Sequence, residues 1–463
     1  MKKRKLTIPH TYTIIFCIIV MMTAMTWLVP SGEFDRFEDA EGRTVVDASS
    51  YHLVEPNPQG IDDLFMSPAK GIVEAAETIA FVLIVGGSFG IINRTGAIDK
   101  GIARAAKRFG KKEILIFPII MILFGLGGTT FGMCEETLPF YMVFIPLMLS
   151  LGYDTLTGIS IVYVAAAAGT AASTINPFSV GIAQSLAELA PGSGFLYRGV
   201  VWLIMMAVAI GFLMIYARKV KSNPENSLVY DLDLKNRDAF HISANQADTF
   251  SRRDQLVLVI FIGGMAVMVF GVLAYGWFTL EIAMVFLITG ILAGFTGGLN
   301  QEVLCDSFID GAKDLIYAAL VIGFSRAILV IAEDGRIIDT ILYQAANALG
   351  GLPKPIFVNL MLVIQNVICF FVPSSSGHAA LTIPIMAPLG DIVGVSRQTI
   401  VLAYQFGTGL TNFITPTNGV LMAALTMAKI PWPRFIRFIL PLMIVLWVIS
   451  AITITVSLYA FPV

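Results

Sequence analysis

Nine apolar stretches, each long enough to cross the hydrocarbon core of a bilayer, constrain the fold of this 463-residue chain. About twenty apolar residues in a helix span roughly 30 Å of hydrocarbon. Only 13% of the residues are charged, which is about half the share found in soluble proteins. Because helices satisfy their own backbone hydrogen bonds in lipid, these features predict an all-α polytopic membrane protein. The predicted spans are 12–30, 72–92, 156–176, 200–217, 255–277, 280–297, 311–331, 399–416 and 438–460.

Two further apolar blocks are interrupted midway by small and polar residues. The first, 114–152, contains TTFGMCEET, and the second, 355–390, contains PSSSGHA. Irregular backbone at membrane depth is tolerated only where protein buries it or where it lines a watery cavity. We therefore expect each block to form a re-entrant helical hairpin with its tip inside the membrane.

The distribution of lysine and arginine orients these elements. With the N-terminus in the cytoplasm, the inner segments hold about three times as many basic residues as the outer segments. Many of them lie in 94–112 and in the polar linker 219–254. We therefore expect the N-terminus inside and the C-terminus outside.

Two halves of the chain resemble each other at an offset of about 240 residues, as in transporters built from repeats. SPAKG corresponds to SFIDG, FIPLM to TIPIM, and INP to ITP. Because the charge distribution makes the two copies enter from opposite sides, we expect inverted repeats. The predicted divisions are a first helix with an outer loop (1–66), a first repeat (67–218), a linker (219–254), two further helices (255–306) and a second repeat (307–463).

Each hairpin is followed by a span that breaks late, at polar and small residues before a proline. The first span, 155–177, ends in GTAASTINP, and the second, 396–418, contains QFGTGLTNFITP. Proline removes a backbone donor and clashes with the preceding turn. Free N–H groups at such a break suit carboxylates, and free carbonyls suit Na⁺ or an ammonium. The alternative is an ordinary pair of kinks healed by neighbouring side chains.

The first hairpin tip carries the adjacent carboxylates Glu135 and Glu136. A charge near the bilayer centre costs at least about 2.5–3.5 kcal/mol, so such groups normally face a cavity. The second tip has hydroxyls and His378 but no lysine or arginine. This pattern predicts a positively charged substrate whose carboxylate is held by amides and hydroxyls. A capping or proton-relay role is the alternative for the glutamates, and a structural hydrogen bond is the alternative for His378.

Other functional classes find little support in the sequence. The 32 acidic and 30 basic residues nearly balance, so there is no basic face for nucleic acid. The four cysteines stand singly, without the spacing of a zinc site or a disulfide framework. No base or orienting partner is evident for the Cys134 thiol, so we expect no enzyme activity. No selectivity-filter motif typical of a channel is present.

Four long motifs, in order, resemble the YfcC-like branch of the anaerobic C4-dicarboxylate carrier (DcuC-like) family. They are GGTTFGMCEETLPFYMVFIPL, INPFSVGIAQ, PSSSGHAALTIPIMAPL and TNFITPTNGVLMAAL. The resemblance covers nearly the whole chain and implies the ion transporter superfamily. It implies a homodimer in the bacterial inner membrane, whose scaffold domain includes 255–306. It also implies a transport domain of two hairpins and two broken helices that moves as an elevator.

The resemblance places the substrate site where the two hairpin tips meet the two helix breaks. The expected substrate-binding residues are Glu135, Glu136, Thr137, Thr174, Asn176, Ser374, Ser375, Ser376, Gly377, His378, Thr411, Asn412, Thr415 and Asn418. If Na⁺ is the coupling ion, we expect it near Ser173, Asn176 and Thr415. The tips read CEET and SSSGH where better-known members of the superfamily have Ser-Asn-Thr, so the same Na⁺ scheme is not expected.

Members of this branch include dicarboxylate carriers and basic amino acid antiporters. The acidic first tip and the absence of basic residues at both tips favour a cationic amino acid. We therefore expect an arginine/ornithine type of exchanger that works by alternating access and needs no cofactor. The alternative is a C4-dicarboxylate symporter coupled to Na⁺ or H⁺, and a channel is a weaker third reading.

Overall fold

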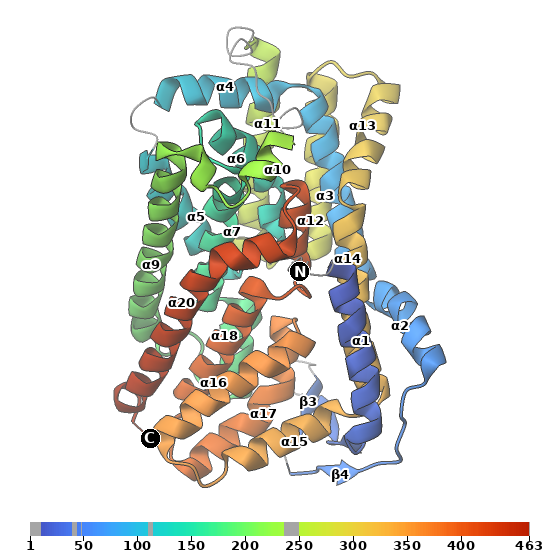
Figure 1. Cartoon of the computed structure of the whole chain (residues 1–463), viewed down its shortest axis with the longest axis vertical. Coiled ribbons are helices and arrows are strands. Elements are labelled where there is room, and N and C mark those ends of the chain that lie inside the picture. Colours follow the sequence, from blue (N-terminus) through green and yellow to red (C-terminus); the bar gives the residue numbers. More distant parts are fainter. Residues whose placement is uncertain (1–10, 39–43, 48, 110–113, 236–249, 463) are drawn as a thin grey trace, which may run out of the picture.

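The computed structural model describes residues 11–38, 44–47, 49–109, 114–235 and 250–462. The described chain is mostly helical (Figure 1). Seven of its helices are long and apolar enough to cross a membrane, which confirms the predicted class of multi-pass helical protein. These helices are α3 (Ala76–Arg94), α9 (Phe195–Ser222), α11 (Arg252–Tyr275), α12 (Thr279–Thr296), α14 (Ile316–Asp334), α16 (Lys354–Phe371) and α20 (Trp432–Ala460).

Shorter helices complete two sets of eight that follow the same order along the chain. The bounds of α2 and α13, the first helix of each set, differ by about 240 residues, the offset of the sequence repeat. The first set also contains α2 (Ile61–Glu74), α4 (Ala97–Phe109), α5 (Ile116–Phe131), α6 (Leu138–Ser150), α7 (Thr155–Ala171) and α8 (Ile182–Leu186). The second also contains α13 (Gln301–Asp314), α15 (Ile338–Leu349), α17 (Ser375–Val393), α18 (Arg397–Ile414) and α19 (Gly419–Met427). Only α1 (Thr11–Leu28), α11, α12 and the linker helix α10 (Tyr230–Lys235) stand outside the two sets of described helices.

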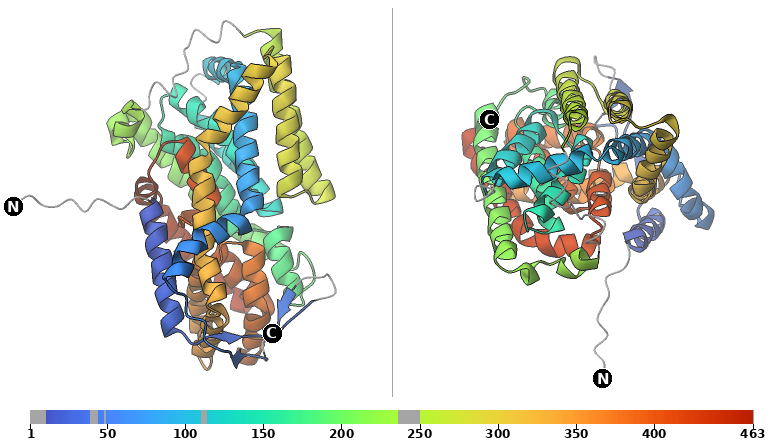
Figure 2. Two further views of the ribbon diagram at one scale, coloured as in Figure 1. Left: turned by 90° about the vertical axis from the view of Figure 1, so that its right-hand side faces the viewer. Right: turned by 90° about the horizontal axis from the view of Figure 1, so that it is seen from above.

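The two sets lie in opposite senses along the molecule. In Figure 1, α4 lies near one end and α15 near the other, and the pairs α5–α6 and α16–α17 likewise lie toward opposite ends. Figure 2 shows the molecule from a second side and along its long axis. The predicted spans 72–92 and 311–331 include only the last residues of α2 and α13. In the structure, α2 and α3 meet at Ala75, and α13 and α14 meet at Leu315.

Reciprocal glycine contacts join the two sets, because α2 packs on α14 and α13 packs on α3. A Cβ atom on Gly71 of α2 would lie 2.4 Å from the carbonyl oxygen of Gly323. A Cβ atom on Gly311 of α13 would lie 2.3 Å from that of Gly86. Small residues let membrane helices approach this closely, so these glycines set the distance between the paired helices.

The remaining helices of the two sets interlock in a second bundle. The short helix α8 packs on α17 of the other set, and α19 packs on α6. Helices α7 and α18 cross at Gly409, where a Cβ atom would lie 2.3 Å from the Cα of Ala171. Because helices of each set pack on helices of the other, the two helix breaks and the two interrupted hairpins lie in one bundle.

The segment between α1 and α2 contains strands that an all-helical prediction does not include. Strand β1 (Gly32–Glu33) pairs antiparallel with β4 (His52–Leu53), and β2 (Arg36–Glu38) pairs antiparallel with β3 (Thr44–Val46). Strands of two or three residues are too short to show a period in the sequence. Strand β3 lies against α17, so this segment reaches the second hairpin.

The linker after α9 contains the short helix α10. Residues 236–249 of this linker and the N-terminal residues 1–10 lie outside the described ranges. Asp233 of α10 accepts hydrogen bonds from the backbone N–H of Thr155 at 3.1 Å and from its hydroxyl at 2.5 Å. Asp154 accepts from Tyr216 at 2.5 Å and from Ser227 at 2.6 Å. The linker therefore caps the first turn of α7, where free N–H groups attract a carboxylate.

We expect the Asp233→Asn substitution to remove the part of the pH dependence of folding stability that comes from titration of Asp233. Burial raises the pKa of Asp233 to about 6, against the opposing effect of the Thr155 hydrogen bonds. The folded protein therefore binds this proton more tightly than the unfolded chain, whose carboxyl has its ordinary pKa of 3.8. The stabilisation is complete below about pH 4 and is lost as the pH rises through about 6.

Thermal unfolding of the purified protein in detergent, followed from pH 4.5 to 7, checks this expectation. The midpoint of Asp233→Asn should fall less over this range than that of the wild type. The exposed Glu225 lies in the same linker, so Glu225→Gln should keep the wild-type slope. Equal slopes in all three proteins would contradict the expectation.

Candidate functional site

The tip of the first hairpin is a tight turn between α5 and α6. Gly132 ends α5 with a φ of +73°, a left-handed conformation that residues with a Cβ rarely adopt. A Cβ atom there would also lie 2.5 Å from the side-chain nitrogen of Asn176. A short 3₁₀ turn over Glu135–Thr137 then leads into α6. The glycine thus lets the turn lie directly on the break after α7.

The two adjacent glutamates differ in their contacts, although both side chains are half-buried. A carboxylate oxygen of Glu136 accepts a hydrogen bond from the backbone N–H of Cys134 at 2.9 Å. Within the described residues, no hydrogen bond or ion pair joins the carboxylate of Glu135 to another residue. Glu136 therefore holds the shape of the tip, and Glu135 has the carboxylate that is free to meet a cation.

Thr137 has a structural position at this tip. Its hydroxyl donates to the carbonyl of Cys134 at 2.5 Å and lies 2.8 Å from the hydroxyl of Tyr141. The residue is 1% exposed. Thr137 therefore closes the turn from inside, and its contacts leave no surface for a substrate in this conformation.

The break after α7 is tied to α5 by threonines. The hydroxyl of Thr129 donates to the carbonyl of Ala172 at 3.1 Å and accepts from the backbone N–H of Thr174 at 3.0 Å. Asn176 accepts from the N–H of Phe178 at 2.9 Å and so caps the turn that leads into α8. Thr174 and Asn176 are thus buried in the junction between tip and break.

The second tip has an exposed and a buried side. Ser374 caps α17 by accepting from the N–H of Gly377 at 3.3 Å, and its hydroxyl lies 3.3 Å from that of Ser376. These three residues are exposed, whereas Ser375 is half-buried and its carbonyl accepts from Tyr404 at 2.6 Å. The exposed serines present hydroxyls that a polar ligand can reach.

His378, predicted at the same tip, faces into the protein. It is fully buried, its Nδ1 lies 2.8 Å from the hydroxyl of Thr408, and its ring meets Tyr404 edge-on at 5.3 Å. Its Nε2 has no hydrogen-bond partner among the described residues. The contacts favour the structural alternative for this histidine.

The end of α18 contacts the second tip through Asn412, and the break that follows contacts Asn412 through Asn418. The amide of Asn412 donates to the carbonyl of Pro373 at 3.2 Å, and that of Asn418 donates to the carbonyl of Asn412 at 2.7 Å. Asn418 also caps α19 by accepting from the N–H of Val420 at 2.9 Å. Thr411, in contrast, turns to α16 and donates to Asn366 at 3.0 Å.

Each broken helix hydrogen-bonds the freed carbonyls of the other. The amide of Gln405 in α18 donates to the carbonyls of Ala171 at 3.2 Å and Ser173 at 2.8 Å. The hydroxyl of Tyr163 in α7 donates to the carbonyl of Asn412 at 3.0 Å. These carbonyls, which the sequence offers to a cation, are therefore occupied by side chains in this conformation.

Arg198 is a buried residue, although it lies between the predicted spans 156–176 and 200–217, in a segment that the charge distribution assigns to the outer side. It lies in the first turn of α9, is 1% exposed, and donates to the side-chain carbonyls of Gln405 and, at 3.5 Å, Gln398. No carboxylate pairs with it among the described residues. The sequence does not predict this burial, because an arginine at the end of an apolar stretch usually extends its side chain to the membrane interface.

The residues expected to hold Na⁺ belong to two different helix breaks. Ser173 and Asn176 share the first break, with 3.5 Å between the Ser173 hydroxyl and the Asn176 amide. The hydroxyl of Thr415 instead lies 2.8 Å from that of Thr417 in the second break. The described residues contain no cluster of three His, Cys, Asp or Glu side chains that could hold a metal ion.

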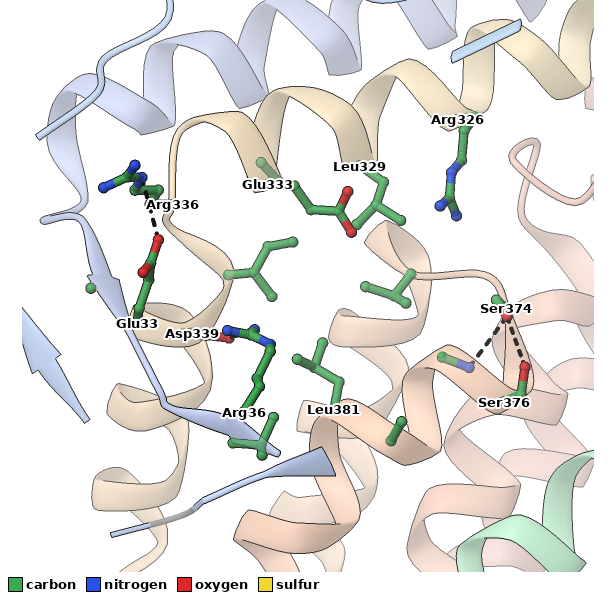
Figure 3. A pocket seen from close by; sticks show the side chains of 17 residues that line it. Glu33, Arg36, Arg326, Leu329, Glu333, Arg336, Asp339, Ser374, Ser376 and Leu381 are labelled. Atoms are coloured by element: carbon green, nitrogen blue, oxygen red, sulfur yellow. Dashed lines mark hydrogen bonds and ion pairs between the residues drawn. The ribbon is translucent and has the colours of Figure 1, made fainter. Parts of the chain in front are cut away.

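A cavity of about 550 Å³ reaches the exposed side of the second tip. It lies between α14, the strand segment after α1 and the hairpin α16–α17 (Figure 3). Of the predicted site residues, only Ser374, Ser376 and Gly377 line it. The charged residues of this cavity did not enter the sequence-based site.

We expect Gly132→Ala to destabilise the first tip by about 1–2 kcal/mol, the cost of a left-handed conformation with a Cβ. The clash with Asn176 adds to this cost because it pushes the tip off the break. The measurement is the unfolding midpoint in detergent. Gly211 lies in α9 with nothing within 4 Å of its Cβ position, so Gly211→Ala should be neutral or stabilising. A Gly132→Ala midpoint equal to that of the wild type would contradict the role of Gly132.

Comparisons with known proteins agree on the family. Residues 8–459 match the family described as C4-dicarboxylate anaerobic carrier (DcuC). An Escherichia coli K12 protein named "Putative basic amino acid antiporter YfcC" is 37% identical, over 97% of this chain and 96% of its own. An uncharacterized Haemophilus influenzae protein is 32% identical over 99% of both chains.

Two solved transporter structures are similar at low sequence identity. The Neisseria gonorrhoeae MtrF structure, described among antimetabolite efflux pumps, has a TM-score of 0.45 at 17% identity and covers 97% of this chain and 95% of its own. The Alcanivorax borkumensis YdaH transporter has a TM-score of 0.46 at 16% identity and covers 98% of this chain and 99% of its own.

Proposed function

The chain belongs to the C4-dicarboxylate anaerobic carrier family, whose members are membrane transporters, and we propose that it exchanges basic amino acids. The observation that carries this proposal is the free carboxylate of Glu135 at a tip without basic residues. A carboxylate in that position attracts a cationic side chain or an α-amine, whereas it repels a dicarboxylate. The name of the E. coli relative supports the same substrate class.

We further propose nine spans and two re-entrant hairpins for this chain. Joining α2 to α3, α7 to α8, α13 to α14 and α18 to α19 gives four bent or broken spans, to which five single helices add. The pairs α5–α6 and α16–α17 are the hairpins. The positive-inside pattern supports a cytoplasmic N-terminus and an outer C-terminus in a bacterial inner membrane.

The proposed mechanism is alternating access by an elevator movement. The second bundle, with both hairpins and both broken helices, would move as one body, which its interlocked packing supports. Helices α1–α3 and α11–α14, which lie outside this second bundle, would form the scaffold of a homodimer. An empty carrier would resist crossing because the unpaired Glu135 is costly to move through the barrier, and this makes exchange obligatory.

A Na⁺- or H⁺-coupled C4-dicarboxylate symporter is the second candidate, because the description of the family names that substrate. It would need an ion gradient and no counter-substrate. The glutamates would then bind the coupling ion, as paired carboxylates attract a cation or share a proton.

Counterflow in proteoliposomes separates the two candidates. Labelled arginine is offered outside, with ornithine, succinate or buffer alone inside. We expect uptake only with ornithine inside. Uptake of labelled succinate on a Na⁺ or proton gradient, without uptake of arginine, would overturn the proposal in favour of the symporter.

A further inference from the structure

The cavity beside the second hairpin is lined by equal numbers of basic and acidic side chains. Three arginines and three carboxylates line it, from α14, from the turn after α14, from the strand segment after α1 and from the start of α15 (Figure 3). None of these six residues lies on a hairpin tip. The cavity is therefore a charged chamber of its own that opens onto the exposed serines of the second tip.

Two of the arginines are paired within the wall. The guanidinium of Arg36 contacts both carboxylate oxygens of Asp339 at 2.9 Å, and Asp339 is 3% exposed. Arg336 lies 3.3 Å from Glu33. These pairs fasten the strand segment to the ends of α14 and α15, across about 300 positions of sequence.

The third arginine and the third carboxylate remain available to a ligand. The Nε of Arg326 donates to Glu74 of α2 at 2.8 Å, and no hydrogen bond occupies its two terminal nitrogens in the described part of the chain. Within the same part, the carboxylate of Glu333 has no hydrogen bond or ion pair. Figure 3 shows both side chains pointing from α14 into the cavity.

The spacing of Arg326 and Glu333 along α14 suits an elongated ligand. Arg326, Leu329 and Glu333 follow one another at i, i+3 and i+7, so they share one face of the helix. Seven residues correspond to about 10.5 Å along the axis. The face thus presents a cation, an apolar side chain and an anion in a row.

We propose that this cavity is a capture site for an α-amino acid with a cationic side chain. The ligand carboxylate would meet the terminal nitrogens of Arg326, its methylene chain would lie on Leu329, and its distal cation would meet Glu333. Such a ligand has its charges in the order opposite to that of the helix face. The inference rests on the proposed function, which gives the substrate class, and it names a second place where that substrate binds.

The opposite wall completes the site. Leu381 of α17 faces the cavity across from Leu329 and adds apolar surface for the methylene chain. Ser374 and Ser376 offer hydroxyl oxygens that accept hydrogen bonds from the α-amine. A ligand bound here would contact the second tip, so movement of this hairpin would transfer the ligand toward the substrate site.

The charges disfavour a dicarboxylate in this cavity. A second ligand carboxylate could not use Arg36, whose guanidinium already holds both carboxylate oxygens of Asp339. It would also meet the unpaired Glu333, and like charges at close range repel. A ligand with one carboxylate and one distal cation matches the terminal nitrogens of Arg326 and the carboxylate of Glu333.

Calorimetric binding to the purified full-length protein tests the site with three probes. L-Arginine carries both charges, L-citrulline lacks the distal cation, and agmatine lacks the carboxylate. We expect Glu333→Gln to weaken arginine binding at least tenfold and to leave citrulline binding unchanged. We expect Arg326→Gln to weaken arginine binding and to leave agmatine binding unchanged. Glu302→Gln, an exposed charge change in α13, is the matched control and should bind all three like the wild type.

Arginine binding that is unchanged in both variants would overturn the inference. Exchange in proteoliposomes separates this failure from failure of the proposed function. If wild-type protein exchanges arginine and Glu333→Gln leaves the external KM unchanged, the capture site is wrong and the exchanger stands. If no arginine is exchanged but the three-probe pattern appears, the exchanger is wrong and the capture site stands. Equal unfolding midpoints exclude misfolding of the variants.

Discussion

The Glu135→Gln variant should exchange arginine for ornithine at least about tenfold more slowly than the wild type while folding normally. The carboxylate of Glu135 has no partner among the described residues, so its loss breaks no internal contact. Removing one member of a desolvated charge pair costs about 2–5 kcal/mol of binding. Even the lower figure corresponds to more than tenfold. Counterflow of labelled arginine measures the effect.

Glu136→Gln is the matched control for this prediction, because it makes the same change of charge one residue away. The glutamine oxygen can still accept from the N–H of Cys134, so the tip keeps its shape. We expect a smaller loss of exchange than in Glu135→Gln. Equal losses in the two variants would contradict the assignment of the substrate cation to Glu135.

The Gln405→Leu substitution should lower the free energy of unfolding by about 3–5 kcal/mol, the usual cost of breaking a buried charged contact. Gln405 accepts from Arg198 and donates to the carbonyls of Ala171 and Ser173. Leucine fills similar space but leaves the buried guanidinium and both carbonyls without this partner. Denaturant unfolding in detergent measures the change.

A second substitution in the same chain separates the buried charge from the lost carbonyl contacts. Adding Arg198→Met to Gln405→Leu removes the guanidinium, so part of the stability should return. Gln398→Leu is the control, since its contact with Arg198 is long, at 3.5 Å, and should cost less. A double variant no more stable than Gln405→Leu would contradict the role of Gln405 as the partner of a buried charge.

Much of the fold follows from local patterns in the sequence. The apolar lengths predict a multi-pass helical protein, and Pro177 and Pro416 mark the regions where α7 and α18 give way to new helices. The polar interruptions fall where the described helices end, at Phe131 and Phe371. These features are readable because length, period and proline act within a few turns of one helix.

The roles of individual site residues were harder to predict. The sequence places Glu135 and Glu136 side by side, yet only contacts distinguish the free carboxylate from the one that holds the tip. His378 and Thr411 belong to the predicted set but bond to Thr408 and Asn366 inside the bundle. A side chain on a helix can face either way, and the neighbours that decide lie on other helices.

The sequence by itself determined that this chain is a multi-pass membrane protein, that it repeats its helices and that it carries adjacent carboxylates within an apolar block. Only the tertiary structure decided that Arg198 is buried and that Arg36 pairs with Asp339. It also decided that Arg326, which Glu74 pairs through Nε, shares a cavity with Glu333, a carboxylate without an ion pair among the described residues. Pairing of charges depends on distances between residues hundreds of positions apart, and those distances arise only when the helices pack.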